Sequence, residues 1–396
     1  MNPNLEPEKL RYAPLLIFWS LWLLNFLSRT ATPPLFPVIE TEFHLLHTYS
    51  GLLFASISVG YALSIILAGH FSATLGHKKT ILISGSFISL AHLMLWSVHN
   101  YLGLLGLFFI LGAGCGAYLP SAVACLTRHY NNVLWGRVLG FHDTAPSAAL
   151  LIGPFFVAIG LGVMPWRGLL TILALINLAL LALFWRLVDD IDARIRPVKG
   201  RWRLMVHHRA IRRITLAFML MSGASLGVFT VIPLMLVKEM HISLDTANTW
   251  LGVSRLGGFV FPFIAGALAD RLGYHTIVLR LYLVSALLTI LVGLISNFTL
   301  LILVLFLQGT IISGFFPLGL SMAALLTDVD ERPAAVALVI FFAVLMGMGL
   351  VPLFLGVMGD LFTFRAGIVS LGVVATLGTF LLQGLRIPLQ EGLPHN

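Results

Sequence analysis

The sequence predicts an all-α membrane protein whose twelve transmembrane helices form two pseudo-symmetric bundles of six. Three observations carry this prediction: an apolar composition, a series of apolar segments of bilayer-spanning length, and a stretch of sequence that occurs twice. The chain has 396 residues, of which 59% are hydrophobic and only 10% are charged, and its mean hydropathy is +0.98. A soluble domain carries about 25% charged residues. Most of the exterior is therefore expected to face lipid.

The apolar segments predict helices and not strands. Windows of about 20 apolar residues, long enough to cross a bilayer as a helix, recur between short polar breaks. Spanning strands would alternate two kinds of residue over about ten positions, whereas residues 169–183 are apolar on every face. The expected spans are 13–38, 50–74, 80–99, 102–127, 134–163, 168–187, 214–237, 248–269, 277–296, 298–325, 334–358 and 366–386.

The two copies of the repeated stretch lie about half the length of the chain apart. It reads GHFSATLGHKKT from Gly69 and GALADRLGYHT from Gly266, and the same offset of 197 residues relates Gly112 to Gly309. A constant offset over separate landmarks indicates two homologous halves. We expect an N-terminal bundle at residues 1–187, a charged linker at 188–213 and a C-terminal bundle at 214–396.

The basic residues predict the topology. If the N-terminus is cytoplasmic, 19 of the 24 Lys and Arg residues lie in cytoplasmic segments, and only Arg167, Lys238 and Arg365 lie in outer loops. Positive charge collects in cytoplasmic loops. Both termini, the linker and both copies of the repeat are therefore expected on the cytoplasmic side. The protein as a whole is expected in the inner membrane of a bacterium. The polar first 12 residues precede a span without a small-residue cleavage site, so no cleaved signal peptide is expected.

Charge and cysteines argue against several other classes of protein. The net charge of +8 is explained by the topology, so no nucleic-acid partner is expected. Cys115 and Cys125 lie ten residues apart in one apolar segment, which rules out a disulfide between them and shows no metal-ligand spacing. The chain has no G-x-x-x-x-G-K-[ST] phosphate loop, which argues against an ATPase. We expect no metal, no cofactor and a monomer.

The arrangement resembles the major facilitator superfamily. Six plus six spans, a long charged linker and the phrase G-x-L-A-D-R-x-G after spans two and eight carry the resemblance over nearly the whole chain. The second copy keeps Gly266, Asp270, Arg271 and Gly273, whereas the first keeps Gly69, Gly76 and its basic end but has Ala73 and Thr74 in place of the acid and the arginine.

The resemblance implies a secondary transporter that is not an enzyme, in which the two halves rock about a site near the middle of the membrane. It also implies that Gly153-Pro154 is similar to the family's antiporter motif, and that the family's arginine in span four is replaced by Phe108. The repeats are expected to form a cytoplasmic gate, in which Asp270 and Arg271 approach the start of span five near Arg137. Alternatively, these two charges only set the topology.

Two arginines within spans are candidates for substrate binding. Arg29 shares one helix face with Asn25 and Thr32, at spacings i, i+4 and i+7, and a charge at mid-span is costly. Arg255 lies about 10 Å into span eight at 1.5 Å per residue, beside Gly257 and Gly258, which allow close packing. The alternatives are a structural ion pair for Arg29 and snorkelling for Arg255. Two buried cations favour a carboxylate or phosphate substrate.

His142 and Asp143 in span five are candidates for proton coupling. Asp143 is the only acid well inside a predicted span. It either neutralises Arg29 as a static partner or titrates during transport with His142 as a relay, since a nearby arginine and burial shift a carboxylate in opposite directions. Tyr61, Tyr118 and Gln308 are further candidates for the substrate cavity, with packing as the alternative.

The sequence thus predicts a secondary transporter that moves a small organic anion by proton-coupled alternating access. The partners are this solute, protons and the bilayer. Export of drugs or metabolites by proton antiport is the alternative, and a membrane sensor on a transporter scaffold is the third possibility. The sequence does not identify the solute or the direction of transport.

Overall fold

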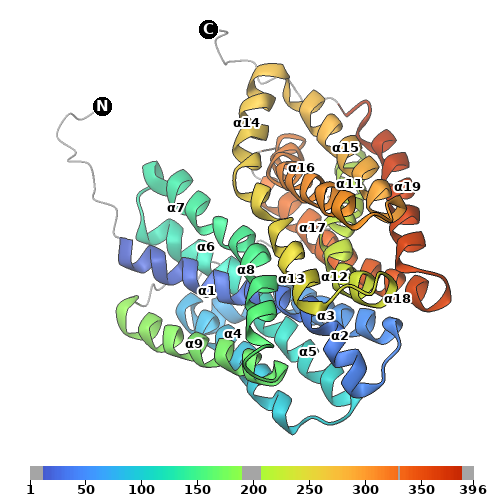
Figure 1. The fold of residues 1–396 in the computed structure, drawn as a ribbon. Coiled ribbons are helices and arrows are strands. Elements are labelled where there is room, and N and C mark those ends of the chain that lie inside the picture. The colour runs from blue at the N-terminus through green and yellow to red at the C-terminus, as the bar shows by residue number, and fades with distance from the viewer. Residues whose placement is uncertain (1–11, 190–206, 329–330, 386–396) are drawn as a thin grey trace. The chain divides into compact units, whose positions relative to one another are not determined.

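The computed structural model describes residues 12–189, 207–328 and 331–385 (Figure 1). These residues contain twelve helical segments long and apolar enough to cross a membrane, as predicted. They are Tyr12–Phe43, His47–Leu75, His77–Ser97, Tyr101–His129, Asn132–Gly160, Trp166–Leu187, Arg209–Glu239, Leu244–Leu272, Tyr274–Leu294, Phe298–Leu325, Ala334–Leu361 and Phe364–Leu382. Most of the predicted linker, residues 190–206, lies outside the described part.

Several spans are built from two or more helical pieces. The first six spans comprise α1 (Tyr12–Thr30), α2 (Thr32–Phe43), α3 (His47–Leu75), α4 (His77–Leu93), η1 (Met94–Ser97), α5 (Tyr101–Gly116), α6 (Tyr118–His129), η2 (Asn132–Leu134), α7 (Trp135–His142), α8 (Thr144–Gly160) and α9 (Trp166–Leu187). The last six comprise α11 (Arg209–Ser222), η3 (Gly223–Gly227), α12 (Val228–Leu234), η4 (Met235–Glu239), α13 (Leu244–Val253), η5 (Leu256–Phe259), α14 (Phe261–Leu272), α15 (Tyr274–Leu294), α16 (Phe298–Leu325), α17 (Arg332–Val344), η6 (Leu345–Leu350), α18 (Val351–Leu361) and α19 (Phe364–Leu382).

Local sequence explains where these helices begin and where the spans are interrupted. The side chains of Asn100 and Asn297 accept hydrogen bonds from the backbone N–H groups of Gly103 and Leu300, and so cap α5 and α16. Two prolines occupy the first turn of α2, where the missing N–H has no partner to lose. The segments η3, η4 and η6 are π-helical, a form that occurs often at functional sites.

Both copies of the repeated stretch end in a turn that requires glycine. Gly76 precedes α4 with a φ of 86°, and Gly273 precedes α15 with a φ of 91°. L-residues with a side chain rarely adopt this conformation, whereas glycine adopts it freely. The second glycine of each copy therefore makes the tight connection between two antiparallel spans.

Residue contacts divide the chain into two compact units. Unit 1 comprises Met1–Thr30, Gly60–Leu150 and Met164–Pro197, and unit 2 comprises Ala31–Val59, Leu151–Val163 and Val198–Asn396. This division differs from the predicted division at the linker. Unit 2 combines parts of spans one, two and five with the C-terminal spans, because α2 packs on α12 and a Cβ on Gly252 would lie 2.7 Å from the ring of Phe155.

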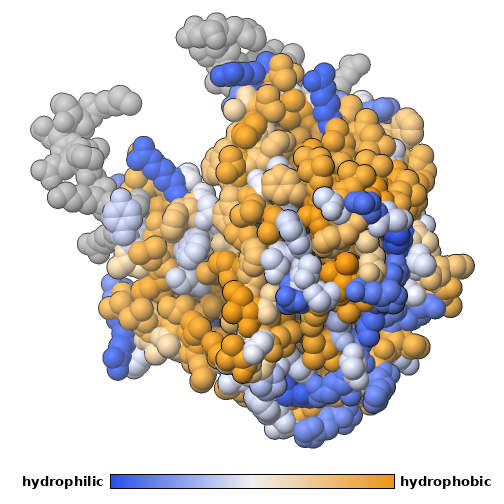
Figure 2. All heavy atoms as spheres, viewed as in Figure 1, coloured by the Kyte–Doolittle hydropathy of each residue, from blue (hydrophilic) through white to orange (hydrophobic). Residues whose placement is uncertain are grey.

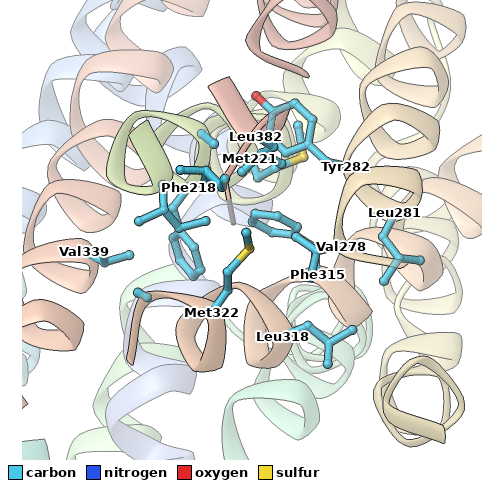
Figure 3. Packing of buried hydrophobic residues seen from close by; sticks show 14 of the residues in the cluster. Phe218, Met221, Val278, Leu281, Tyr282, Phe315, Leu318, Met322, Val339 and Leu382 are labelled. Atoms are coloured by element: carbon cyan, nitrogen blue, oxygen red, sulfur yellow. The ribbon is translucent and has the colours of Figure 1, made fainter. Parts of the chain in front are cut away.

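Each unit has its own packed interior. In unit 1, α4 packs between α5 and α9, and the Asn177 side chain donates hydrogen bonds to the Gly85 carbonyl at 2.8 Å and to Ser89 Oγ at 2.9 Å. In unit 2, Phe218 and Phe315 meet at 5.4 Å between ring centroids, with Met221 and Tyr282 beside them (Figure 3). Phe315 is fully buried in this apolar core.

The surface of the molecule is largely apolar. Figure 2 shows hydrophobic residues over most of the visible face, and the exposed large side chains include Leu102, Ile159, Val163 and Phe263. A soluble monomer rarely exposes apolar patches larger than a few hundred Å². The exterior therefore fits a lipid environment, as the composition predicts.

Candidate functional site

Arg255 stands in an interruption of the eighth span, within unit 2. α13 ends at Val253, Arg255 has the bridge-region angles φ −99° and ψ −4°, and a short 3₁₀ turn follows before α14. A Cβ on Gly257 would lie 1.9 Å from Thr310 Oγ1, whereas one on Gly258 would lie 3.7 Å from Ser313. Gly257 therefore lets the interrupted span approach α16 closely, whereas Gly258, which the sequence analysis paired with it, is not needed for this approach.

The guanidinium of Arg255 has a buried edge without a protein partner. Arg255 is 5% exposed, its Cζ lies 4.9 Å from the centroid of the Phe229 ring, and its Nη1 faces Gly309 of α16. Nε and Nη2 are buried and have no hydrogen-bond acceptor within residues 12–189, 207–328 and 331–385. These two nitrogens form the side of the fork that matches the two oxygens of a carboxylate.

Two neutral polar residues of α16 contribute differently. Thr310 Oγ1 is also buried without a partner. Gln308 donates from Nε2 to the Ala224 carbonyl at 2.8 Å and to Thr289 Oγ1 at 3.4 Å, so its amide links α16 to η3 and α15, while its Oε1 has no partner. Gln308 has a structural role in this state, in addition to any contact with a solute.

Arg29 lies near the end of α1 in unit 1 and is enclosed by aromatic rings. It is 2% exposed, and its Cζ lies 4.1 Å from the Phe26 ring centroid and 4.7 Å from that of Tyr61. Its Nη2 donates to Asn25 Oδ1 at 3.1 Å and its Nε to the Asn25 carbonyl at 3.4 Å. Asn25 in turn donates to the Cys115 carbonyl at 3.1 Å. Thr32, on α2, is buried in unit 2.

A stack of rings continues from Arg29 to span five. Trp22 lies 6.0 Å from Arg29 and stacks on Tyr118 at 5.2 Å and on His142 at 5.8 Å. Tyr118 donates from its hydroxyl to the Phe18 carbonyl at 2.6 Å and lies 3.3 Å from His142 Nε2. The imidazole is thus fixed in orientation by two flat neighbours and one hydroxyl.

Asp143 lies at the break between α7 and α8, and its position does not match the expected pairing with Arg29. Its side chain is 69% exposed and its Oδ1 lies 3.4 Å from His142 Nδ1, whereas Arg29 is buried among rings. The helix ends at His142 and starts again at Thr144, which turns the carboxylate outward. The described contacts therefore join Asp143 to His142. The His142 imidazole lies between the Asp143 carboxylate and the rings of Trp22 and Tyr118.

The residues of the expected gate lie at exposed positions within their own units. Asp270, Arg271 and Gly273 are exposed in unit 2, and Arg137 is exposed in unit 1. A Cβ on Gly266 would meet nothing within 4 Å, so close approach does not explain this glycine here. Gly69 contributes its carbonyl to Ser72 Oγ at 3.2 Å, and Gly76 makes the turn described above.

Sequence reasoning missed the aromatic partners of both arginines. Phe26 and Trp22 precede Arg29 by three and seven residues on one helix, so helical spacing alone could have indicated them. Phe229 contacts Arg255 from the preceding span, and no spacing in the sequence predicts that contact. The break at Arg255 had a weak signal in the pair of glycines that follows it.

The chain resembles a known family and several curated transporters in sequence. The family profile described as "Major Facilitator Superfamily" matches residues 18–279 and 214–394. Among curated proteins, the probable L-galactonate transporter of Escherichia coli (strain K12) is 22% identical over 66% of this chain and 61% of its own length. The gallate transporter of Pseudomonas putida is 24% identical over 66% of each chain. The probable sulfoacetate transporter SauU of Cupriavidus necator is 23% identical over 69% of this chain and 68% of its own.

Solved structures resemble the fold closely despite low identity. A bacterial homologue of the human lysosomal transporter Spinster, in an inward-facing and occupied conformation, has a TM-score of 0.79 at 15% identity and covers 95% of this chain and 97% of that one. A D-xylose–proton symporter also has a TM-score of 0.79 at 15% identity, with coverage of 94% and 97%. At this identity the likeness establishes the architecture alone.

Proposed function

The chain belongs to the Major Facilitator Superfamily, a family of transporters and not of enzymes, and from that premise we propose that it moves a small organic anion across the membrane by alternating access. Both termini are proposed to lie in the cytoplasm of a bacterium, since positive charge is concentrated on that side of the predicted topology. The transported solute, protons and lipid are the proposed partners, and the proposed working unit is a monomer.

One observation carries the anionic specificity. The Nε and Nη2 groups of Arg255 are buried and have no acceptor among the residues that the structure describes. A buried charge without a partner is costly, so such groups are normally completed by an ion pair or a ligand. A carboxylate or sulfonate would accept both hydrogen bonds at once and neutralise the guanidinium. Arg29, with Asn25 and Tyr61, is the second proposed anchor.

The names of the relatives support the same class. Galactonate, gallate and sulfoacetate are organic anions that carry a carboxylate, and sulfoacetate also carries a sulfonate. The chain and these relatives differ at more than three quarters of the aligned positions, so the class of solute is proposed and not one particular compound. Phe229 beside Arg255 and the rings around Arg29 add apolar surface that an extended or aromatic acid would use.

Ligand-dependent thermal stabilisation tests this proposal. The purified protein would be heated with a panel of carboxylates and sulfonates, and with the neutral alcohol and amide analogue of each. We expect stabilisation by one group of anions and its loss in Arg255→Gln, because the glutamine keeps polarity but lacks the charge and the fork. Arg280→Gln, which changes an exposed arginine on α15, is the matched control and should keep the stabilisation.

Two outcomes would argue against the anionic specificity. One is equal stabilisation by the neutral analogues, and the other is full stabilisation by anions in Arg255→Gln. A change in both arginine variants would point to general electrostatic attraction and would also contradict a dedicated site. Arg29→Gln, measured in parallel, shows whether the second arginine takes part in binding.

We also propose that transport is coupled to protons, with His142 and Asp143 as the pair that exchanges them. The support is geometric: one ring nitrogen of His142 lies beside the Asp143 carboxylate and the other beside the Tyr118 hydroxyl. Asp143→Asn in proteoliposomes is expected to abolish the stimulation of uptake by an imposed pH gradient while exchange of solute continues. Unchanged stimulation would exclude an essential protonation at Asp143.

The cytoplasmic gate remains part of the proposal. Asp270 and Arg271 in unit 2 and Arg137 in unit 1 carry exposed charges at the ends of their helices. An acid is favourable beside a helix N-terminus and a basic side chain. We propose that these residues, with Gly69, Gly76, Gly266 and Gly273, close the cytoplasmic side in the outward-open state.

A further inference from the structure

A partly buried polar cluster within unit 2 joins segments from both halves of the sequence. This His47 cluster consists of Glu40 on α2, His47, Thr48 and Ser50 in the first turn of α3, and Asp360 near the end of α18. Glu40 is 3% exposed and Ser50 is 1% exposed. Neither the substrate proposal nor the coupling proposal uses these residues.

Asp360 caps α3 from more than 300 residues away in the chain. Its Oδ1 accepts a hydrogen bond from the His47 backbone N–H at 2.9 Å. Its Oδ2 accepts from the Thr48 backbone N–H at 2.8 Å and from Thr48 Oγ1 at 2.6 Å. The first N–H groups of a helix have no partner within the helix, and this end carries a partial positive charge. A carboxylate from span eleven thus completes the N-terminus of span two.

The remaining members hold the first turn of α3 in the position that Asp360 needs. His47 Nδ1 lies 3.0 Å from each oxygen of Glu40, and Ser50 Oγ donates to Glu40 Oε1 at 2.9 Å. The His47 ring lies 4.7 Å from that of Phe364, at the start of α19. Phe364 N–H donates in turn to Glu239 Oε1. The charges near His47 are therefore Glu40, Asp360, Glu239 and Lys238.

Next to this cluster, the backbones of α3 and α18 are in close contact. A Cβ on Gly356 would lie 2.5 Å from the His47 carbonyl, and one on Gly51 would lie 2.6 Å from the Pro352 carbonyl. Deeper along α3, Ser58 Oγ donates to the Val344 carbonyl at 3.0 Å, and Ser58 is fully buried. Over these three turns α3 packs against α18 and the end of α17.

From this geometry we propose that Asp360 acts as a latch, which holds the transporter closed at the end of the membrane where the His47 cluster lies. Alternating access requires that parts of the two halves separate at one end of the membrane at a time. At this end the separation has to break three charge-assisted or hydroxyl hydrogen bonds to a single carboxylate. Removal of that charge therefore shifts the equilibrium toward the state that is open here. The proposal rests on the family alone and not on the anionic substrate.

Cysteine accessibility tests the latch. Ser58→Cys places a nearly isosteric reporter at the buried contact between α3 and α17. In reconstituted full-length protein, a membrane-impermeant maleimide would react with this cysteine when the contact opens. The natural Cys115 and Cys125 are buried, and the parent chain measures their background. We expect Asp360→Asn to raise the rate of modification of the reporter about fivefold, as removal of a carboxylate from a helix N-terminus predicts.

Two further variants make the result specific. Thr48→Val removes only the hydroxyl bond and should give a smaller rise in the same direction, which also serves if Asp360→Asn does not fold. Asp245→Asn changes an exposed aspartate in the first turn of α13 and should leave the rate unchanged. The proposal is overturned if Ser58→Cys is modified at the same rate with and without Asp360→Asn. It is also overturned if Asp245→Asn raises that rate as much as Asp360→Asn does. Neither result bears on which solute is carried, because the assay contains none.

Discussion

At the scale of single residues, both arginines are held where a charge would otherwise be unfavourable. Arg29 is surrounded by the rings of Phe26 and Tyr61, and Arg255 lies against Phe229. Cation–π contact recovers part of the cost of desolvation, about 2 kcal/mol or more in a dry environment. In Arg255 the ring contact leaves Nε and Nη2 without an acceptor in the described part of the chain, so the contact that stabilises the charge also presents it to an anion.

The glycine that follows Arg255 offers a sharp test of this packing. A Cβ on Gly257 would lie 1.9 Å from Thr310 Oγ1 and 2.7 Å from Thr310 Cβ. Thr310 is β-branched and lies on a helix, so its side chain cannot move away from this clash. We expect Gly257→Ala to lower the free energy of unfolding by about 1–3 kcal/mol, the usual cost of overpacking. Thermal unfolding in detergent measures the effect.

Gly258→Ala is the control for this experiment. Its Cβ would lie 3.7 Å from Ser313, an ordinary contact distance, so its unfolding midpoint should stay close to that of the parent. If the two alanine variants unfold at the same temperature, the close approach of η5 to α16 is not present in the folded protein.

At the scale of elements, the interruptions of the helices matter most. Asp143 and Arg255 lie in breaks, and Arg29 lies within the last turn of α1, next to the break at Ala31. Discontinuous helices are typical of sites at which transporters bind their solutes, because a break frees backbone groups that can contact a solute or an ion. The repeated stretch, by contrast, forms the rigid turns between complete spans.

The turn of the second repeat gives a prediction about an element. Gly273 has a φ of 91°, and a side chain in this conformation costs about 1–3 kcal/mol. Gly273→Ala should therefore unfold at a lower temperature than the parent. Gly266→Ala, in the same repeat, meets nothing within 4 Å and lies in a helix, so it should be neutral or slightly stabilising. An opposite order of the two midpoints would contradict the assigned turn.

The sequence was sufficient for the spans but not for their interiors. Length and hydropathy identified all twelve segments, because the bilayer demands about 20 apolar residues for each crossing. Their ends were placed too short where polar caps extend the helix, as at Phe43 and Arg209. The breaks at Ala31, Ala117 and Asp143 were not predicted, because tertiary packing decides whether a glycine or proline interrupts a helix or is tolerated within it.

In the candidate site, only the charged residues within apolar spans could be predicted from the sequence. A lone charge within an apolar segment is visible in the sequence, and Arg29 and Arg255 are indeed buried. The position of Asp143 depends on a break that turns its carboxylate outward, and the sequence did not predict that break. Glu40 and Asp360 lay beyond the predicted span limits and were treated as loop residues, and their common partner His47 is apparent only in three dimensions.

At the scale of the whole molecule, the internal duplication accounts for the scaffold but not for the chemistry. Gly76 and Gly273, the second glycines of the two repeats, have similar φ angles of 86° and 91°, whereas Arg29, Asp143 and Arg255 have no counterparts at the offset of the repeat. The halves therefore share a fold and differ in their charged residues. Such a division fits a transporter in which the scaffold moves and a few unmatched side chains select the solute.

The central claim, transport of an organic anion that depends on Arg255, is tested most directly by flux in proteoliposomes. Entry of a labelled carboxylate selected by thermal stabilisation would be followed in the parent, in Arg255→Gln and in Arg280→Gln, with the neutral amide of the same compound as reference. We predict saturable entry of the anion in the parent and in Arg280→Gln, and none above empty liposomes in Arg255→Gln or for the amide. Equal entry of the amide, or undiminished entry of the anion in Arg255→Gln, would contradict the account.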